Sequence, residues 1–151
     1  MKAAELMVGD LVCLKDDTNY ELPLKVDGVL TNDISLEGDG FLGGAEGLIR
    51  PIPITPEILE KNGFDADTFL TAEWEEKVYF KEFPGCVVKP DNSGKYIFGT
   101  TIYWNKTGGD GSPIDWGTMY ESMIYNLQYV HELQNALRLC GFNELADNFK
   151  L

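Results

Sequence analysis

The only histidine of the chain, His131, is the residue whose chemistry stands out first, because an imidazole can ligate a metal or exchange a proton near neutral pH. It begins the run HELQN at residues 131–135, which is similar to the zinc-protease pattern of two histidines four residues apart on a helix. Asn135 occupies the second ligand position, and an asparagine amide is a poor zinc ligand. The sequence therefore argues against a zinc hydrolase. We interpret His131 as a side chain at the edge of an apolar helix face, hydrogen-bonded to a neighbour.

Residues that could act as nucleophiles occur without the partners that would activate them. Ser93 and Ser122 stand outside any nucleophile-elbow pattern. Cys13, Cys86 and Cys140 are far apart and odd in number, which predicts reduced thiols in an apolar core. The 25 acidic residues offer no means of choosing a catalytic pair. No catalytic residue is assigned, and the question of enzymatic activity stays open, with a non-enzymatic role favoured.

Two glycine-rich segments, residues 38–44 and 108–113, raise the question of phosphate or metal binding. Both lack the Gly-Lys-Ser/Thr ending of a P-loop, and the acids within them would repel phosphate. Asp110, Ser112 and Asp115 offer oxygen ligands for calcium, but the order of an EF-hand loop is absent. Both segments are interpreted as turns, and neither a metal nor a cofactor is expected.

Aromatic residues supply the one candidate ligand site. Trp104, Tyr125, Tyr129 and His131 could line a pocket between strands and the C-terminal helix, as in a binder or hydrolase of small molecules or carbohydrates. Base stacking on a single-stranded nucleic acid would also need a basic track, and only seven basic residues are scattered between residues 77 and 151. These four residues are therefore candidates for ligand binding, with packing in a core or an interface as the commoner alternative.

Charge points away from nucleic acid as a partner. The chain of 151 residues has 12 Lys or Arg against 25 Asp or Glu, a net charge of −13 that repels a phosphate backbone. Residues 1–75 hold 5 basic and 16 acidic residues, whereas residues 76–151 hold 7 and 9. This acidity is the basis of a minor alternative, in which the N-terminal part mimics nucleic acid and occupies a DNA-binding protein. Solubility is the commoner reason for such a charge.

The N-terminal residues carry an acid, Glu5, where a secretory signal would begin its apolar stretch. No uninterrupted apolar run approaches the length that spans a membrane. A cytoplasmic protein without membrane contact is therefore expected.

The first 53 residues predict a unit of short strands. Alternating or apolar runs at residues 11–14, 22–26, 34–37 and 48–52 are separated by turn signals and by the loop at residues 38–44. Such closely spaced strands are typical of a small antiparallel SH3-like β-barrel, which hides its sheet edges by closure. Pro51 and Pro53 then predict a stiff connector.

Residues 54–151 predict an α+β unit that could also share one compact domain with the barrel. Thr55, Pro56 and Gly63 are the N-cap, first position and left-handed terminator of a short helix, with Phe64 folded back onto Leu59. An antiparallel meander follows at residues 68–74, 77–83, 86–89 and 95–104.

A long helix is predicted after the meander. The residues Thr118 and Glu121 fit a capping box, and apolar residues recur at three-to-four spacing as far as Gly141. The apolar face, which includes position 133 or 134, is expected to pack on the meander. Polar residues form the opposite face: Gln128, Glu132, Asn135 and Arg138. A short closing helix is expected from Asn143 to Phe149.

Three segments together resemble a known group of proteins: ELMVGDLV near the N-terminus, PIPITPEILEKNGF at residues 51–64, and YVHELQNALRLCGFNEL at residues 129–145. They are similar to small proteins of unknown function from Bacteroidetes genomes and their prophages or mobile elements. The resemblance implies a phage or mobile-element context and assigns no site residue.

The leading hypothesis is a non-enzymatic accessory protein that acts by protein–protein contact. It is based on the absence of a catalytic pattern, the acidic N-terminal part and the aromatic and methionine residues that could extend into an interface. The partner is unidentified, and self-association stays open.

Overall fold

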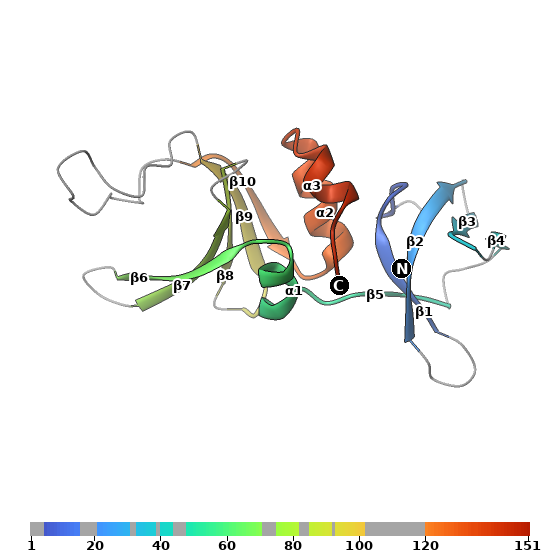
Figure 1. Cartoon of the computed structure of the whole chain (residues 1–151), viewed down its shortest axis with the longest axis horizontal. Coiled ribbons are helices and arrows are strands. Elements are labelled where there is room, and N and C mark those ends of the chain that lie inside the picture. Colours follow the sequence, from blue (N-terminus) through green and yellow to red (C-terminus); the bar gives the residue numbers. More distant parts are fainter. Residues whose placement is uncertain are drawn as a thin grey trace. The chain divides into compact units, whose positions relative to one another are not determined.

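The computed structural model describes residues 5–15, 21–30, 33–38, 40–43, 48–70, 75–81, 85–91, 93–101 and 120–151. It confirms an α+β protein, with two five-stranded antiparallel sheets and short helices (Figure 1). Two compact units contain these sheets. Unit 1 comprises Met1–Thr55 together with Gln128–Leu151, and unit 2 comprises Pro56–Leu127. Unit 2 is thus an insertion in the chain of unit 1, whereas the sequence suggested a simple division after residue 53.

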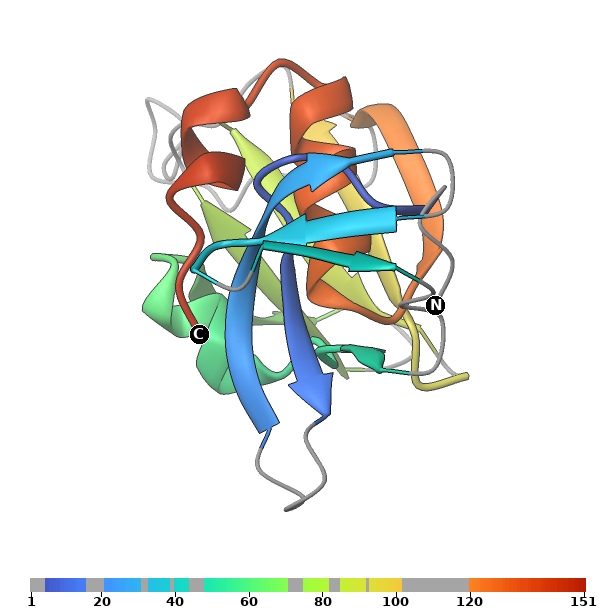
Figure 2. The same cartoon turned by 90° about the vertical axis from the view of Figure 1, so that its right-hand side faces the viewer.

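The sheet of unit 1 has the strand order β4-β3-β2-β1-β5, with every neighbouring pair antiparallel. Its strands are β1 (Leu11–Lys15), β2 (Glu21–Val29), β3 (Asp33–Leu36), β4 (Gly40–Gly43) and β5 (Ile49–Pro51). The pairing between β2 and β3 is irregular between Val26 and Gly28, where the residue opposite shifts. Figure 2 shows that β3 and β4 run across the direction of β1. The long strand β2 therefore belongs to both parts of a strongly bent sheet.

The predicted closed barrel is not what the structure shows. In the described residues of unit 1, β4 and β5 are the two ends of the sheet and do not pair with each other. β5 is only three residues long and ends at Pro51, whose missing backbone donor is compatible with an edge. β4 was not expected at all, because its sequence GFLG lies within the glycine-rich segment interpreted as a turn. The unit is a bent, open sheet.

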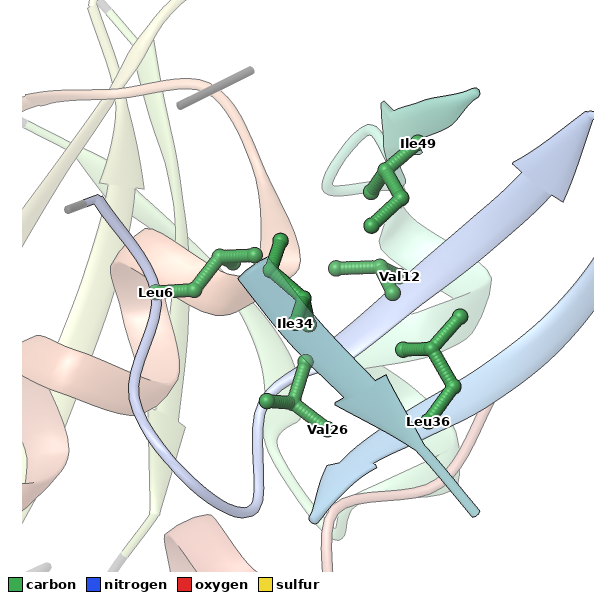
Figure 3. Close-up of a cluster of buried hydrophobic side chains, with 6 residues drawn as sticks. All are labelled: Leu6, Val12, Val26, Ile34, Leu36 and Ile49. Atoms are coloured by element: carbon green, nitrogen blue, oxygen red, sulfur yellow. The ribbon is translucent and has the colours of Figure 1, made fainter. Parts of the chain in front are cut away.

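The core of unit 1 lies where the bent sheet faces itself. Six buried side chains meet there, and Figure 3 shows them converging from the N-terminal segment and from β1, β2, β3 and β5: Leu6, Val12, Val26, Ile34, Leu36 and Ile49. Ile34 and Leu36 are two residues apart and so point to the same face of β3. Full burial of one such side chain contributes about 1.5–3 kcal/mol, so this cluster supplies much of the driving force for folding the N-terminal strands.

The C-terminal segment completes unit 1. The amide of Ile54 donates to the carbonyl of Gln128 (2.9 Å), and the amide of Val130 donates to the carbonyl of Ile52 (2.8 Å). The chain therefore returns beside the connector from which it left. Two helices follow, α2 (Val130–Leu139) and α3 (Asn143–Asp147). α3 confirms the short closing helix, and α2 contacts β1 and α3 within this unit.

Both ends of α2 have the local signals of a helix. The carboxylate of Glu132 accepts hydrogen bonds from the amides of Gln128 (2.7 Å) and Tyr129 (3.1 Å) before the first turn. At the other end Gly141 has φ +84°, and the amide of Phe142 reaches back to the carbonyl of Leu137 (2.8 Å). Only a residue tolerant of positive φ closes a helix in this way. The predicted long helix is not shown, because α2 has only 10 residues and begins about three turns later than predicted, although it ends just before Gly141 as the sequence indicated.

Unit 2 begins with α1 (Pro56–Lys61), which confirms the predicted helix. Its terminator Gly63 has φ +73°, and the amide of Phe64 donates to the carbonyl of Leu59 (3.1 Å), with both of these apolar side chains buried. The amine of Lys81 donates to the carbonyl of Asn62 (2.9 Å) at the same helix end. This ending agrees with the expected left-handed glycine and its apolar contact.

The predicted meander is confirmed as a sheet of order β10-β9-β8-β7-β6. Its strands are β6 (Asp65–Leu70), β7 (Glu75–Lys81), β8 (Cys86–Pro90), β9 (Tyr96–Thr101) and β10 (Tyr120–Leu127). A cluster of Val78, Phe80 and Val87 lies in its core. None of the three cysteines forms a disulfide, and Cys86 is buried as expected, whereas Cys13 and Cys140 are only partly buried.

The first part of the predicted long helix is wrong, because Tyr120–Leu127 forms strand β10 and pairs with β9. Thr118, the expected N-cap, lies outside the described residues. The spacing of Tyr120, Met123, Ile124 and Leu127 fits a helix face, but irregular pairings at both ends of β10 allow a strand to carry the same spacing. Aromatic and β-branched residues also favour strands. Tertiary pairing therefore decided the structure of this segment.

Candidate functional site

A turn at the start of β1 positions the first residue of the candidate site. The carboxylate of Asp10 accepts a hydrogen bond from the amide of Met7 (2.8 Å), and the amide of Asp10 donates back to the carbonyl of Met7 (3.1 Å). Gly9 has φ +94°, and its amide donates to the carbonyl of Val26 on β2 (2.7 Å). The motif Val8-Gly9-Asp10, interpreted as a turn from the sequence, thus directs a fully buried carboxylate into unit 1.

Gln134 on α2 holds that turn from the other side. Its Oε1 accepts from the amide of Leu11 (2.9 Å), and its Nε2 donates to the carbonyls of Gly9 (3.1 Å) and Ala146 (2.8 Å). The side chain is fully buried, so each of these bonds replaces water that the three backbone groups would otherwise need. One amide therefore ties together the first strand, the turn before it and α3.

Arg138, one turn further along α2, forms an ion pair with Asp10 at 2.5 Å. The guanidinium also contacts the carboxylate of Asp147 at 3.2 Å and the amide oxygen of Asn135 at 3.1 Å. The side chain of Arg138 is only 10% exposed, so its expected place on the polar outer face of a helix is wrong. Such a buried pair is costly to break, since removal of one partner leaves the other charge without compensation. We call Asp10, Gln134, Arg138 and Asp147 the polar cluster.

His131, near the start of α2, is also buried, with 4% of its surface exposed. Its ring stacks on that of Tyr129, with ring centroids 5.9 Å apart and planes inclined by 10°. Burial lowers the pKa of His131, while the negative charges of Glu132, Asp10 and Glu5 raise it and offset part of that effect. The ring is therefore neutral at pH 7. Its Nδ1 has no hydrogen-bond partner among the described residues.

The four predicted ligand-binding residues do not all lie in one described site. It brings Tyr129 and His131 together in unit 1, whereas Tyr125 is an exposed residue of β10 in unit 2 whose hydroxyl donates to the sulfur of Met123 (3.4 Å). Trp104 lies outside the described residues. The predicted pocket between the meander and the C-terminal helix stays a prediction.

Sequence reasoning missed the polar cluster itself. Its weak signal was Gln134, a polar residue at a position where the apolar stripe of the helix should continue. The sequence alone indicates a turn at Asp10 and a place on the polar face of a helix for Arg138. Nothing in the local sequence links these residues, since Asp10 and Arg138 are 128 positions apart.

The chemistry available to the polar cluster is structural. The carboxylate of Asp10 and the amide of Gln134 are each engaged by groups of the protein itself. In the described ranges no group of three or more His, Cys, Asp and Glu residues could hold a metal ion. Among the helices that the structure describes, none combines the length and the hydropathy that a bilayer-spanning segment needs.

No protein-family model matches the chain, and neither a curated protein nor a solved structure shows significant similarity to it.

Proposed function

We propose that this chain is a non-enzymatic accessory protein of a bacterial phage or mobile element, and that it acts through contact with another protein. The observation that carries the proposal is a set of exposed apolar side chains in unit 1 that lie next to the polar cluster in sequence. Met7 and Val8, in the turn before β1, are 48% and 59% exposed, and Leu139, the last residue of α2, is 80% exposed. We call these three residues the apolar end.

The apolar end is assembled by the polar cluster. Asp10 closes the turn that contains Met7 and Val8. Its ion pair with Arg138 joins that turn to the last turn of α2, where Leu139 follows Arg138. Single exposed apolar residues are common, but three next to one polar cluster in sequence are a candidate anchor for a partner. A turn fixed by buried hydrogen bonds also loses little conformational entropy on binding.

The fold supports a binding module. The strand order β4-β3-β2-β1-β5, with the bent β2 shared by both parts of the sheet, supports an SH3-like arrangement of unit 1, with the sheet left open. The resemblance to prophage and mobile-element proteins of Bacteroidetes supplies the biological context. A fold of this kind serves many functions, so the argument depends on the apolar end.

The test uses the tagged full chain as bait in a lysate of phage-bearing Bacteroidetes cells, with quantitative mass spectrometry of the retained proteins. The double variant Val8→Asp/Leu139→Asp adds charge to the apolar end. Leu30→Asp is the control, since Leu30 is an exposed apolar residue of unit 1, 54% exposed, that follows β2 and is not part of the apolar end. We expect a partner retained by wild type and Leu30→Asp and lost from the double variant. A lysate without a stoichiometric partner, or a partner indifferent to the double variant, would contradict the proposal.

A second candidate, a small-molecule or carbohydrate binder, is favoured by one observation. The buried Nδ1 of His131, beside the stacked ring of Tyr129, has no partner in the part of the chain that the structure describes, and a polar group of a ligand could supply one. A thermal-shift screen of sugars and metabolites tests it. A hit whose stabilisation disappears in His131→Phe supports binding there, and an unchanged melting temperature throughout the screen contradicts it.

A further inference from the structure

Four strand edges end the two sheets, and they differ in how well they could accept another strand. In unit 1, β5 has three residues with a proline, and β4 is bounded by glycines. In unit 2, β10 is long, but its pairing with β9 is irregular between Tyr120 and Ser122 and between Ile124 and Leu127. Short strands, proline and bulges are the features that protect edges from further pairing.

β6 has none of these protections. Its six residues pair with β7 in unbroken register from Asp65 opposite Phe80 to Leu70 opposite Glu75, and its sequence DADTFL contains no proline, glycine or lysine. Within the described part of unit 2, no strand pairs with its other side. In an antiparallel strand, alternate residues direct their amide and carbonyl groups away from the paired neighbour. β6 therefore offers a regular row of backbone donors and acceptors.

The ribbon of β6 and β7 also extends beyond the rest of its sheet. β8 pairs only with the last three residues of β7, Tyr79–Lys81, so the pairs from Thr68 opposite Lys77 to Leu70 opposite Glu75 have no third strand (Figure 1). A two-stranded ribbon alone is marginally stable, and each added strand stabilises it. Addition of a strand along β6 would thus stabilise the part of the ribbon that its own sheet leaves unsupported.

Charge decides which strand can be added. β6 contains Asp65 and Asp67, and the paired strand β7 begins with Glu75 and Glu76. Two copies of this edge would bring like charges together, and each copy carries a net charge of −13. Self-pairing is therefore disfavoured. A strand rich in lysine or arginine would instead place opposite charges beside these acids.

We propose that the free edge of β6 binds an extended, basic segment of a partner protein by β-augmentation, as a sixth strand of the sheet of unit 2. The inference rests on the proposed function only in taking a protein as the partner. The residues of β6 belong to unit 2, whereas those of the apolar end belong to unit 1. Backbone hydrogen bonds supply the affinity, and the acids select a basic sequence and orient it.

The experiment starts with a phage-displayed library of random decapeptides selected on the immobilised full chain. The strongest peptide is then synthesised and titrated by fluorescence anisotropy against wild type and two double variants. Asp65→Asn/Asp67→Asn changes the proposed edge, and Asp27→Asn/Glu37→Gln is the matched control, which removes two negative charges from exposed positions of unit 1. We expect selected peptides enriched in lysine or arginine and in β-branched residues. Their binding should weaken about tenfold in the edge variant and little in the control.

Hydrogen exchange provides the second measurement, because an added strand should slow the exchange of amides in β6 and leave those of unit 1 unchanged. Peptides without a basic bias, equal weakening in both variants, protection away from β6 or failure to select any peptide would each overturn the proposal. A cellular partner lost in Val8→Asp/Leu139→Asp but unaffected by Asp65→Asn/Asp67→Asn would leave the proposed function standing and remove this inference. A partner that is lost in Asp65→Asn/Asp67→Asn but unaffected by Val8→Asp/Leu139→Asp would support the β6 edge and contradict binding at the apolar end.

Discussion

Replacing Gln134 by alanine should destabilise unit 1 far more than any substitution of an exposed glutamine. The change leaves three buried backbone groups, the amide of Leu11 and the carbonyls of Gly9 and Ala146, without their partners. Each buried group left unsatisfied costs about 1–3 kcal/mol. Water that enters the vacated space offsets part of this cost, so we expect a loss of about 3–6 kcal/mol. That is a large fraction of the roughly 5–15 kcal/mol by which small domains are stable.

Urea unfolding at pH 7.5 can measure this loss and assign it to a unit. All three tryptophans, Trp74, Trp104 and Trp116, belong to the segment Pro56–Leu127, so tryptophan fluorescence reports on unit 2 and far-ultraviolet circular dichroism on both units. With a slope of about 2 kcal/mol per M, the dichroism transition of unit 1 should move down by about 1.5–3 M urea. The fluorescence midpoint should stay in place.

Two further variants make the result interpretable. Gln128→Ala is the matched control, because Gln128 is exposed and belongs to the same unit. Gln134→Glu keeps an acceptor for Leu11 but loses both N–H donors, so it should still be strongly destabilised. A shift in Gln134→Ala no larger than in Gln128→Ala would refute the view that this side chain holds unit 1 together.

Three other predictions concern the same region. Arg138→Met should cost about 3–5 kcal/mol by thermal or urea unfolding, because the buried carboxylate of Asp10 loses its counter-charge, and adding Asp10→Asn should restore much of that loss. Gly9→Ala should lower the free energy of unfolding by about 1–3 kcal/mol, since φ is +94° and the new Cβ would lie 2.7 Å from Nη2 of Arg138. Gly38→Ala is the control: its φ is +91°, but no atom lies within 4 Å of the new Cβ, so the loss should be only about 1 kcal/mol. Because burial lowers the pKa of His131 below its usual value of about 6.5, the unfolded chain binds its proton first as pH falls. The urea midpoint of unit 1 should therefore be lower at pH 5.5 than at pH 7.5, with a smaller difference in His131→Phe; an equal difference in both proteins would contradict this origin.

Local signals predicted the elements that depend on neighbours in sequence. The helix ending at Gly63 and Phe64 needs only a residue that accepts positive φ and an apolar contact a few positions away, and both are legible in the sequence. The turns and strands of the meander are legible for the same reason. β10 was missed because its apolar spacing also fits a helix, and only pairing with β9 distinguishes the two structures.

The candidate site was much less predictable than the fold. Tyr129 and His131 have the chemistry of a ligand site and do lie together, but the contacts of Gln134 with Leu11 and of Arg138 with Asp10 join residues more than 120 positions apart. Such pairs leave no local pattern, because periodicity reports which face of a helix is buried and not which backbone groups it meets there. A polar residue inside an apolar stripe, as at Gln134, is the one sequence signal that its side chain bonds to a buried donor or acceptor.

The insertion of unit 2 into unit 1 has a consequence for how the chain folds during its synthesis. The strands of residues 11–51 leave the ribosome well before Gln134 and Arg138, which close the turn that precedes those strands. All of Pro56–Leu127 is synthesised in between and can fold as a unit before the N-terminal strands meet α2. A nascent or prematurely terminated chain that lacks α2 would leave Asp10 without its arginine and the amide of Leu11 without its acceptor. Completion of unit 1, with its distant contacts, should therefore be slow and should follow the folding of unit 2.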